Sequence, residues 1–213
     1  MPLLQVIHEA ADLLVLDKPS GLLCVPGRGA DKQDCLSARA QQRWPDALVV
    51  HRLDMATSGL VLMARGADMQ RTLSQAFADQ QVDKCYEAVV DGLLQGDNAT
   101  WQQIDAPIAA DWPRRPLRII DPVLGKRSLT RWHVKATLPE RDATHVELAP
   151  QTGRTHQLRV HLAHIGHPIL GDALYGSESV QARAPRLLLH ATRLAFPHPF
   201  SGQALCFESP APF

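Results

Sequence analysis

Short apolar runs separated by turn residues dominate the chain and predict many strands. The run GLVLMA at residues 59–64 is apolar throughout, which is typical of a strand buried on both faces. The run at 11–17 ends in a Pro-Ser-Gly turn, the kind of boundary expected at a strand end. We expect strands within residues 11–17, 47–51, 59–65, 84–92, 128–139, 143–150, 186–196 and 203–209.

Three segments have helical spacing instead. Residues 34–43 suit a helix with Asp34 as N-cap, and residues 68–81 place their apolar side chains on one helical face. Residues 155–166 carry Leu158, Leu162 and Ile165 at helical intervals, which predicts an amphipathic helix with Thr155 as N-cap and Gly166 at its end.

The remaining pattern defines the fold class. Residues 92–122 are rich in turn formers and are expected to be irregular. Strands and helices mix without a regular βαβ rhythm, so we expect an α+β domain with a mixed, mostly antiparallel sheet flanked by helices and loops. The length of 213 residues is enough for one large domain or two small ones.

Charge changes this picture only locally. The 22 basic and 22 acidic residues balance, which taken alone argues mildly against a nucleic-acid partner. Two clusters nevertheless contain no acid, and a basic face on a neutral protein can still bind phosphates. The clusters are Arg114, Arg115 and Arg118, followed by Lys126, Arg127 and Arg131. Solvated surface residues are the alternative interpretation.

Cysteine usage and hydropathy bear on the compartment. The four cysteines are scattered and form no C-x-x-C pair, so we expect free thiols in a reducing compartment, as in a cytoplasmic enzyme. No apolar run is long enough to span a bilayer, and we expect no membrane partner.

One carboxylate, Asp54, stands five residues before the apolar run at 59–64, close to His51 and Arg52 in the sequence. A charge next to a core is costly unless it is paired or used. An Asx turn is the commonest role for such an aspartate, and a catalytic carboxylate kept ionised by neighbouring cations is the functional alternative.

Other candidate groups have equally plain alternatives. Arg154 precedes the predicted third helix, where its guanidinium could reach a carboxylate or simply lie at the surface. Tyr86 fits a half-buried strand tyrosine. His161 and His164 lack a companion ligand at metal-site spacing, so we expect no metal. Ser58 could serve as a nucleophile, but no spacing selects a histidine for it.

Three segments together resemble the RluA-type pseudouridine synthases. HRLDMATSGLVLMAR at 51–65 is similar to the H-R-L-D-x-x-T-S-G motif, and DKCYEAVV at 83–90 resembles the second motif of that family. PQTGRTHQLRVHLAHIGHPILGDALYG at 150–176 is similar to the third. Within the family, the short chain and DWPRRP at 111–116 are most similar to dual-specificity synthases acting on a hairpin of large-subunit ribosomal RNA and on the tRNA anticodon stem-loop.

The resemblance implies the pseudouridine synthase fold, with residues 1–213 as a single catalytic domain. Because the pattern begins near Leu13, no N-terminal S4 domain is expected. It further implies a monomeric enzyme that isomerises uridine in RNA without a cofactor.

The resemblance also implies roles for individual residues. Asp54 would be the catalytic aspartate, Arg154 its ionic partner and Tyr86 the residue that stacks on the base. Arg52 would fill the space that the flipped uridine vacates. Further substrate contacts would come from His51, Thr57, His156 and Gln157, from Leu188 or Leu189 at the pocket floor, and from Arg114, Arg115, Arg118, Lys126 and Arg127 at RNA phosphates.

Two other functions remain alternatives at this point. A non-catalytic RNA-binding module would need the basic clusters but neither Asp54 nor Tyr86. A hydrolase would use Ser58 or a carboxylate. The sequence leaves open which uridines are modified, and whether Asp54 attacks C1′ or removes the C2′ proton.

Overall fold

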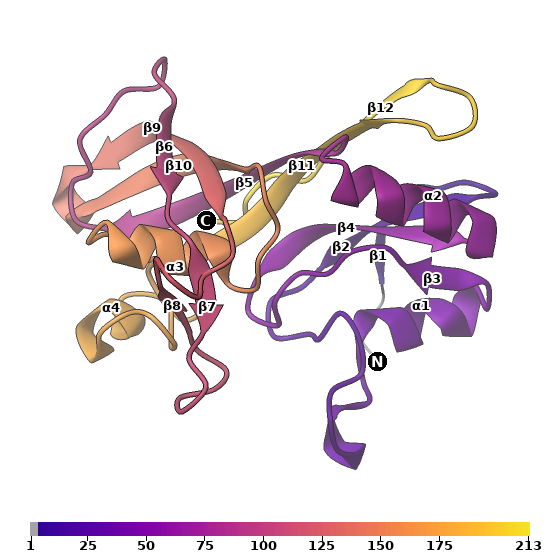
Figure 1. The fold of residues 1–213 in the computed structure, drawn as a ribbon, viewed down its shortest axis with the longest axis horizontal. Helices are drawn as coiled ribbons and strands as arrows, with labels where there is room; N and C mark the ends of the chain where they lie inside the picture. The colour runs from indigo at the N-terminus through magenta and orange to yellow at the C-terminus, as the bar shows by residue number, and fades with distance from the viewer. Residues whose placement is uncertain (1–3) are drawn as a thin grey trace. The chain divides into compact units, whose positions relative to one another are not determined.

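A computed structural model describes residues 4–213, which form two compact units (Figure 1). The first contains the described part of Met1–Lys84 together with His190–Pro212, and the second contains Cys85–Leu189 and Phe213. Each unit combines strands with helices, and within each unit the named strands that pair are antiparallel, except that β4 and β11 pair in parallel. The predicted α+β class with mixed, mostly antiparallel sheet is confirmed.

In the first unit, neighbouring strands follow the order β1-β2-β4-β11, with β3 on β4 and β12 on β11. The strands are β1 (Gln5–Glu9), β2 (Leu13–Lys18), β3 (Ala47–Val49), β4 (Ser58–Arg65), β11 (Leu189–Pro197) and β12 (Ala204–Glu208). The helices are α1 (Leu36–Arg43), α2 (Ala67–Ala78) and the short 3-10 helix η1 (Ala30–Lys32).

Strand β4 is buried along almost its whole length because helices cover both of its faces. Leu60 and Leu62 pack with Met69 and Leu73 of α2 in one apolar cluster. Figure 1 shows α1 on the opposite side of β3 and β4 from α2. The run GLVLMA is apolar throughout for this reason, as the sequence predicted.

In the second unit the antiparallel strands follow the order β5-β10-β9-β6, and β7 and β8 form a separate hairpin. The strands are β5 (Asp83–Asp91), β6 (Gln102–Asp105), β7 (Ile108–Ala110), β8 (Arg118–Ile120), β9 (Leu129–Leu138) and β10 (Ala143–Pro150). The helices are η2 (Pro139–Arg141), α3 (Gln157–His164) and α4 (Glu178–Ala182).

Two expectations about a loop and a helix start are wrong. Residues 92–122 are not irregular throughout, because β6, β7 and β8 lie within them. Cys35, not Asp34, is the N-cap of α1, since the Asp34 carboxylate instead binds Arg39 with two contacts of 2.6 Å.

Helix α3 differs most from its predicted form. It begins after His156, which adopts a left-handed backbone conformation, so Thr155 is not the N-cap. Its first six residues are all buried, and the helix therefore lacks the polar face of an amphipathic helix. The expected glycine at its end is confirmed, because Gly166 has φ +86°.

Candidate functional site

The half-buried Asp54 lies in the loop between β3 and β4. Residues 18–24 stabilise this loop through hydrogen bonds. The Asp54 carbonyl accepts a hydrogen bond from the Thr57 N–H at 3.1 Å, which closes a turn. The next residue, Met55, accepts the N–H of Gly21 through its carbonyl at 2.8 Å. Ser20 donates its hydroxyl to the Ala56 carbonyl at 2.7 Å. The loop is therefore fixed by hydrogen bonds to its backbone, some of them from side chains.

Lys18 is the strongest of these supports. Its side chain is fully buried, and its ammonium donates to the carbonyls of Pro19 at 2.9 Å, Leu22 at 2.8 Å and Met55 at 3.1 Å. A buried ammonium needs partners for its three protons, and these carbonyls supply them. Sequence reasoning missed this role. The available signal was a lysine at the end of a mostly apolar strand.

His51 anchors the other end of the loop. Its Nε2 lies 2.9 Å from the backbone nitrogen of Leu62, whose N–H it accepts, and its ring stacks on Phe77 at 4.4 Å. Desolvation, with a smaller contribution from the Lys84 charge, lowers the pKa of His51 to about 3. The imidazole is therefore neutral near pH 7 and performs a structural task. Its predicted contact with substrate stays a prediction.

The Thr-Ser-Gly end of the first motif packs against β11. Thr57 and Ser58 are both 3% exposed. Ser58 is hydrogen-bonded to Nδ1 of His190 at 2.8 Å, where β4 and β11 run parallel. Gly59 has φ +111°, and a Cβ there would lie 2.4 Å from the Ala191 carbonyl oxygen. Only glycine allows the two strands to approach this closely.

The contacts of Ser58 also bear on the hydrolase alternative. Nε2 of His190 lies 3.1 Å from the Ser209 hydroxyl, which donates to the Asp17 carboxylate at 2.6 Å. This series of hydrogen bonds contains the residue types of a catalytic triad. Because Ser58, His190 and Ser209 are nearly inaccessible to solvent, the evident role of these bonds is to join the first motif to the C-terminal segment.

In the second unit, Tyr86 lies half-buried on β5, opposite Leu148 of β10. Arg154 is exposed in the loop before α3, and its Nε donates to the Arg127 carbonyl at 3.2 Å. The backbone of this loop is fixed by Gln157, whose Oε1 accepts the Arg154 N–H at 3.0 Å. Gln157 is 4% exposed and also donates to Thr130, so it supports the loop from within the core.

The third motif is also tied to the β7–β8 hairpin. Nδ1 of His156 is hydrogen-bonded to the Tyr175 hydroxyl at 2.7 Å, and that hydroxyl accepts the backbone N–H of Arg118 at 3.0 Å. Nearby, the buried Arg159 forms a two-pronged ion pair with the buried Asp172. Sequence reasoning did not assign Tyr175 or Arg159 to the site.

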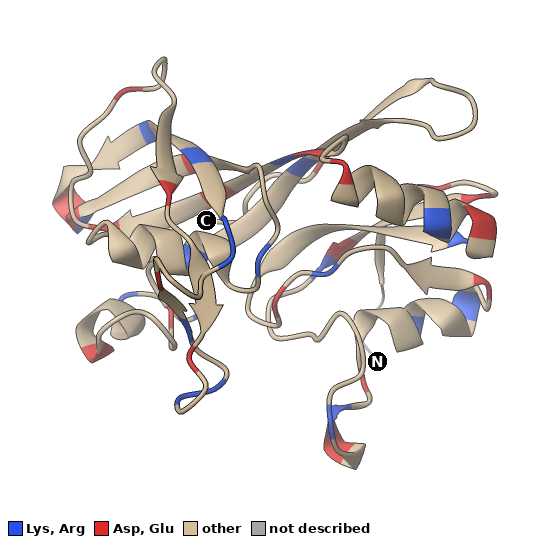
Figure 2. Ribbon diagram, viewed as in Figure 1, with Lys and Arg blue, Asp and Glu red and all other residues tan. Residues whose placement is uncertain are grey.

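The predicted basic residues have different surroundings. Arg114 pairs with the buried Asp111, and Arg115 lies over the Trp112 ring at 3.4 Å from its centroid. Lys126 and Arg127 are exposed. Figure 2 shows basic residues at the end of the loop between β7 and β8. Arg118 is half-buried, and its Nε is buried. The exposure of the other four residues is compatible with phosphate binding.

Leu188 and Leu189 are 5% and 3% exposed. The Leu188 carbonyl accepts the Val89 N–H at 3.2 Å, and its own N–H donates to Leu170 at 3.0 Å. Both residues are therefore buried, and the backbone of Leu188 is fixed by hydrogen bonds. Their place at a pocket floor stays a prediction.

The ring of His161 in α3 is engaged in hydrogen bonds on both sides. Nδ1 and Nε2 of the fully buried His161 lie 2.9 Å from the Thr130 hydroxyl and the Ala106 carbonyl, so both ring nitrogens are occupied. Residues 4–213 contain no cluster of three or more His, Cys, Asp and Glu side chains suited to a metal ion. No helix in that range is long and apolar enough to cross a membrane.

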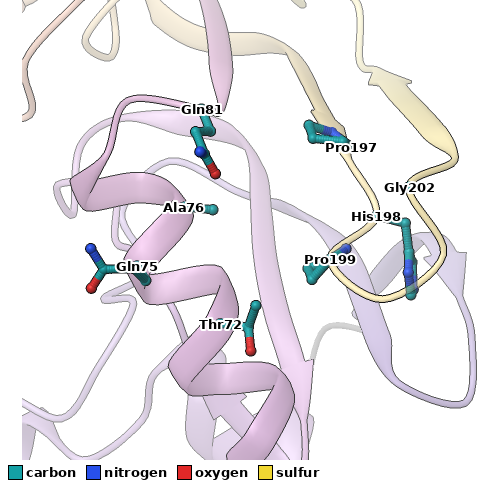
Figure 3. A pocket seen from close by; sticks show the side chains of 8 residues that line it. All are labelled: Thr72, Gln75, Ala76, Gln81, Pro197, His198, Pro199 and Gly202. Carbon is teal, nitrogen blue, oxygen red and sulfur yellow. The ribbon is translucent and has the colours of Figure 1, made fainter.

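A separate cavity of about 270 Å³ lies in the first unit between α2 and the turn joining β11 to β12 (Figure 3). None of the predicted site residues lines it. Its lining consists of Thr72, Gln75, Ala76, Gln81, Pro197, His198, Pro199 and Gly202.

The predicted catalytic residues thus fall on two units. The first unit brings Asp54 together with His51, Arg52 and Thr57 on one braced loop, and the second holds Tyr86, Arg154, His156 and Gln157. The pairing of Arg154 with Asp54 stays a prediction.

Comparison with known proteins places this arrangement in context. Residues 12–164 match the family model described as RNA pseudouridylate synthase. The chain is 41% identical over 212 residues to the dual-specificity RNA pseudouridine synthase RluA of Escherichia coli strain K12, covering 100% of this chain and 95% of the relative. The corresponding protein of Haemophilus influenzae is 40% identical with the same coverage.

Solved structures agree with the sequence relatives. Human RNA Pseudouridylate Synthase Domain Containing 1 superimposes with a TM-score of 0.81 and 30% identity, covering 99% of this chain and 84% of that one. Human RNA Pseudouridylate Synthase Domain Containing 4 gives a TM-score of 0.76 and 25% identity, covering 98% and 88%. The predicted pseudouridine synthase fold is confirmed.

Proposed function

Because the chain belongs to the RNA pseudouridylate synthase family and is an isomerase, we propose that it converts specific uridines to pseudouridine in both a hairpin of 23S ribosomal RNA and the tRNA anticodon stem-loop. The dual-specificity names of its relatives, at about 40% identity over the whole chain, support this choice of substrates. The observation that carries the catalytic assignment is the placement of Asp54 on a loop braced by Lys18 and its neighbours.

The reaction suits a single carboxylate. Isomerisation breaks the bond from N1 of uracil to C1′, turns the base and joins C5 to C1′. No water is added, so the second carboxylate of a glycosidase is not needed. Asp54 acts at C1′ or C2′ of the ribose, and both routes are compatible with one carboxylate. The hydrogen bonds that fix its loop lower the entropic cost of orienting that carboxylate during the reaction.

Residues of the second unit complete the proposed site. Arg154 pairs with Asp54, while Tyr86 stacks on the base and assists proton movement at C5. Leu188 or Leu189 supplies apolar pocket surface. For this arrangement the two units act as one catalytic domain across residues 1–213. The exposed guanidinium of Arg154 and its loop, fixed by Gln157, support its role.

The target uridine must leave its base stack to react. Other residues bind the RNA around this uridine. Arg52 fills the vacated space, while His51, Thr57, His156 and Gln157 contribute substrate contacts. Arg114, Arg115, Arg118, Lys126 and Arg127 bind RNA phosphates. Ribosomal and transfer RNA substrates place the activity in the cytoplasm, and the enzyme acts as a monomer.

Release of tritium from RNA labelled at uridine C5 tests the proposal. We expect release into solvent from both substrate RNAs without any additive, and pseudouridine in the digested product. Binding without release would favour an RNA-binding module, whereas strand cleavage would favour a hydrolase. Mapping pseudouridines in RNA from a strain lacking the protein then identifies the target positions.

A further inference from the structure

Trp112 is the feature that the proposed catalytic site does not use. It lies in the loop between β7 and β8, and its side chain is 70% exposed. The Arg115 guanidinium carbon lies 3.4 Å from the centroid of its ring, which is stacking distance. With one ring face against Arg115 and most of the residue in solvent, the opposite face is available to a planar partner.

The loop that presents Trp112 is tightly fixed. The Asp111 carboxylate is 6% exposed and accepts Arg114 Nε at 2.7 Å. The Asp111 N–H donates to the Leu117 carbonyl at 3.1 Å, and the Leu117 N–H donates to the Arg114 carbonyl at 3.0 Å. An exposed aromatic ring on such a loop loses little conformational freedom on binding.

The charge around the ring favours a nucleic acid over an apolar protein surface. Residues 111–118 contain Arg114, Arg115 and Arg118 against a single acid, Asp111, which is already paired with Arg114. Aromatic rings beside cations are the usual means of binding single-stranded nucleic acid, because every base has a face that can stack.

The hairpin is also continuous with the third motif within the second unit. The Arg118 backbone N–H binds the Tyr175 hydroxyl, which in turn binds His156. RNA bound at the third motif would therefore lie next to the β7–β8 hairpin. Figure 2 shows basic residues at the end of this hairpin.

We propose that Trp112 and Arg115 form a stacking platform for one unpaired nucleobase of the RNA substrate, distinct from the uridine that reacts. The proposal rests on the RNA substrate of the proposed function. The base stacks on the free face of the indole, and Arg115 backs the other face while attracting the adjoining phosphate. The platform contributes affinity and substrate choice rather than chemistry.

The test compares Trp112→Leu, Trp112→Phe and the control Val123→Ala, in which an apolar side chain that is 88% exposed is shortened. Fluorescence anisotropy measures the Kd for the anticodon stem-loop RNA at several salt concentrations. We expect Trp112→Leu to weaken binding about tenfold, and Trp112→Phe to restore most of it. Val123→Ala should bind as the parent does.

Binding measurements at several salt concentrations and with abasic RNAs then test whether Trp112 acts by stacking on a base. Trp112→Leu should leave the slope of log Kd against log salt unchanged, because indole neutralises no phosphate, whereas Arg115→Gln should lower that slope by about one. Abasic nucleotides are placed singly along the loop of the RNA. At one non-reacting position, removal of the base should weaken parental binding and abolish the difference between the parent and Trp112→Leu.

Turnover separates this proposal from the proposed function. If the parent releases tritium, Trp112→Leu should raise KM with kcat nearly unchanged. An active parent whose Trp112→Leu variant keeps its Kd and KM would overturn the platform. So would altered self-association in sedimentation with unchanged RNA affinity, which would assign Trp112 to a protein interface. An inactive parent with the expected binding pattern would contradict only the isomerase assignment.

Discussion

The ammonium nitrogen of Lys18 lies 3.1 Å from the carbonyl oxygen of Met55, the residue that follows Asp54. Since the same ammonium also binds the carbonyls of Pro19 and Leu22, one buried side chain joins the end of β2 to the loop that carries Asp54. The conformation of this loop therefore depends on a residue far from it in sequence.

Replacing Lys18 with methionine should loosen this loop. The substitution keeps an unbranched chain but leaves the buried Leu22 carbonyl and the partly buried carbonyls of Pro19 and Met55 without their donor, so we expect a loss of about 2–4 kcal/mol in the free energy of unfolding. We also expect kcat to fall more than RNA affinity. Urea denaturation and tritium release measure the two effects. The exposed Lys32→Met is the matched control, and equal effects from both variants would contradict the proposed role.

Gly59→Ala should destabilise the first unit through its close approach to β11. A Cβ at 2.4 Å from the Ala191 carbonyl adds overlap to the strain of φ +111°. The expected loss is about 2–5 kcal/mol. Gly202→Ala is the control, because its φ of +71° is also unfavourable but no atom lies within 4 Å of the new Cβ. It should cost about 1–2 kcal/mol. Similar losses in urea denaturation would contradict the steric explanation.

The half-buried His51 predicts a pH-dependent stability. Its pKa of about 3 in the folded protein is below its ordinary value of 6.5, so the unfolded chain binds a proton that the folded chain does not between these values. Stability should consequently fall as pH drops below 6.5, by up to about 1.4 kcal/mol per pH unit.

His51→Gln should remove this dependence while keeping an acceptor for the Leu62 N–H. Urea denaturation between about pH 4 and 6.5 would give the slope for each protein. Because His161, whose pKa burial also lowers, is present in both, the difference in slope isolates His51. Parallel curves would mean that His51 is protonated in the folded state.

Asp54→Asn should abolish turnover and leave RNA binding intact, because the amide keeps the shape and the backbone contact to Thr57 but cannot act as a carboxylate. We expect kcat to fall at least about a thousandfold. The control is Asp46→Asn, which breaks an ion pair with Arg65 in the same unit and should leave kcat unchanged. Residual Asp54→Asn activity within about tenfold of the parent would exclude a catalytic aspartate here.

Strands with strong apolar patterns were predictable from sequence, and contacts between distant segments were not. Strand β4 and helix α2 follow from local periodicity, whereas β6 has the unremarkable sequence QQID and exists because it pairs with β9. Helix α3 has no polar face because neighbouring elements bury it, which its own spacing does not reveal.

The same limit applies to the candidate site. The sequence motifs identified Asp54 and Arg154 as candidate residues, because a motif is defined by the types and the order of its residues. The carbonyls around Lys18, and the bonds of Tyr175 to His156 and Arg118, become evident only when the chain is folded.

Arg52→Ala should separate base flipping from chemistry. Arg52 is exposed and lies two residues before Asp54 on the same loop. If it compensates part of the cost of extruding uridine, its loss removes about 1–3 kcal/mol and slows turnover about tenfold to a hundredfold. The defect should shrink on a hairpin whose target uridine is already unstacked, since less extrusion work remains. Asp54→Asn should gain nothing from that hairpin.

Single-turnover rates on the structured hairpin and on the hairpin with the unstacked uridine test this prediction. An equal Arg52→Ala defect on the two RNAs would assign Arg52 to catalysis or phosphate binding.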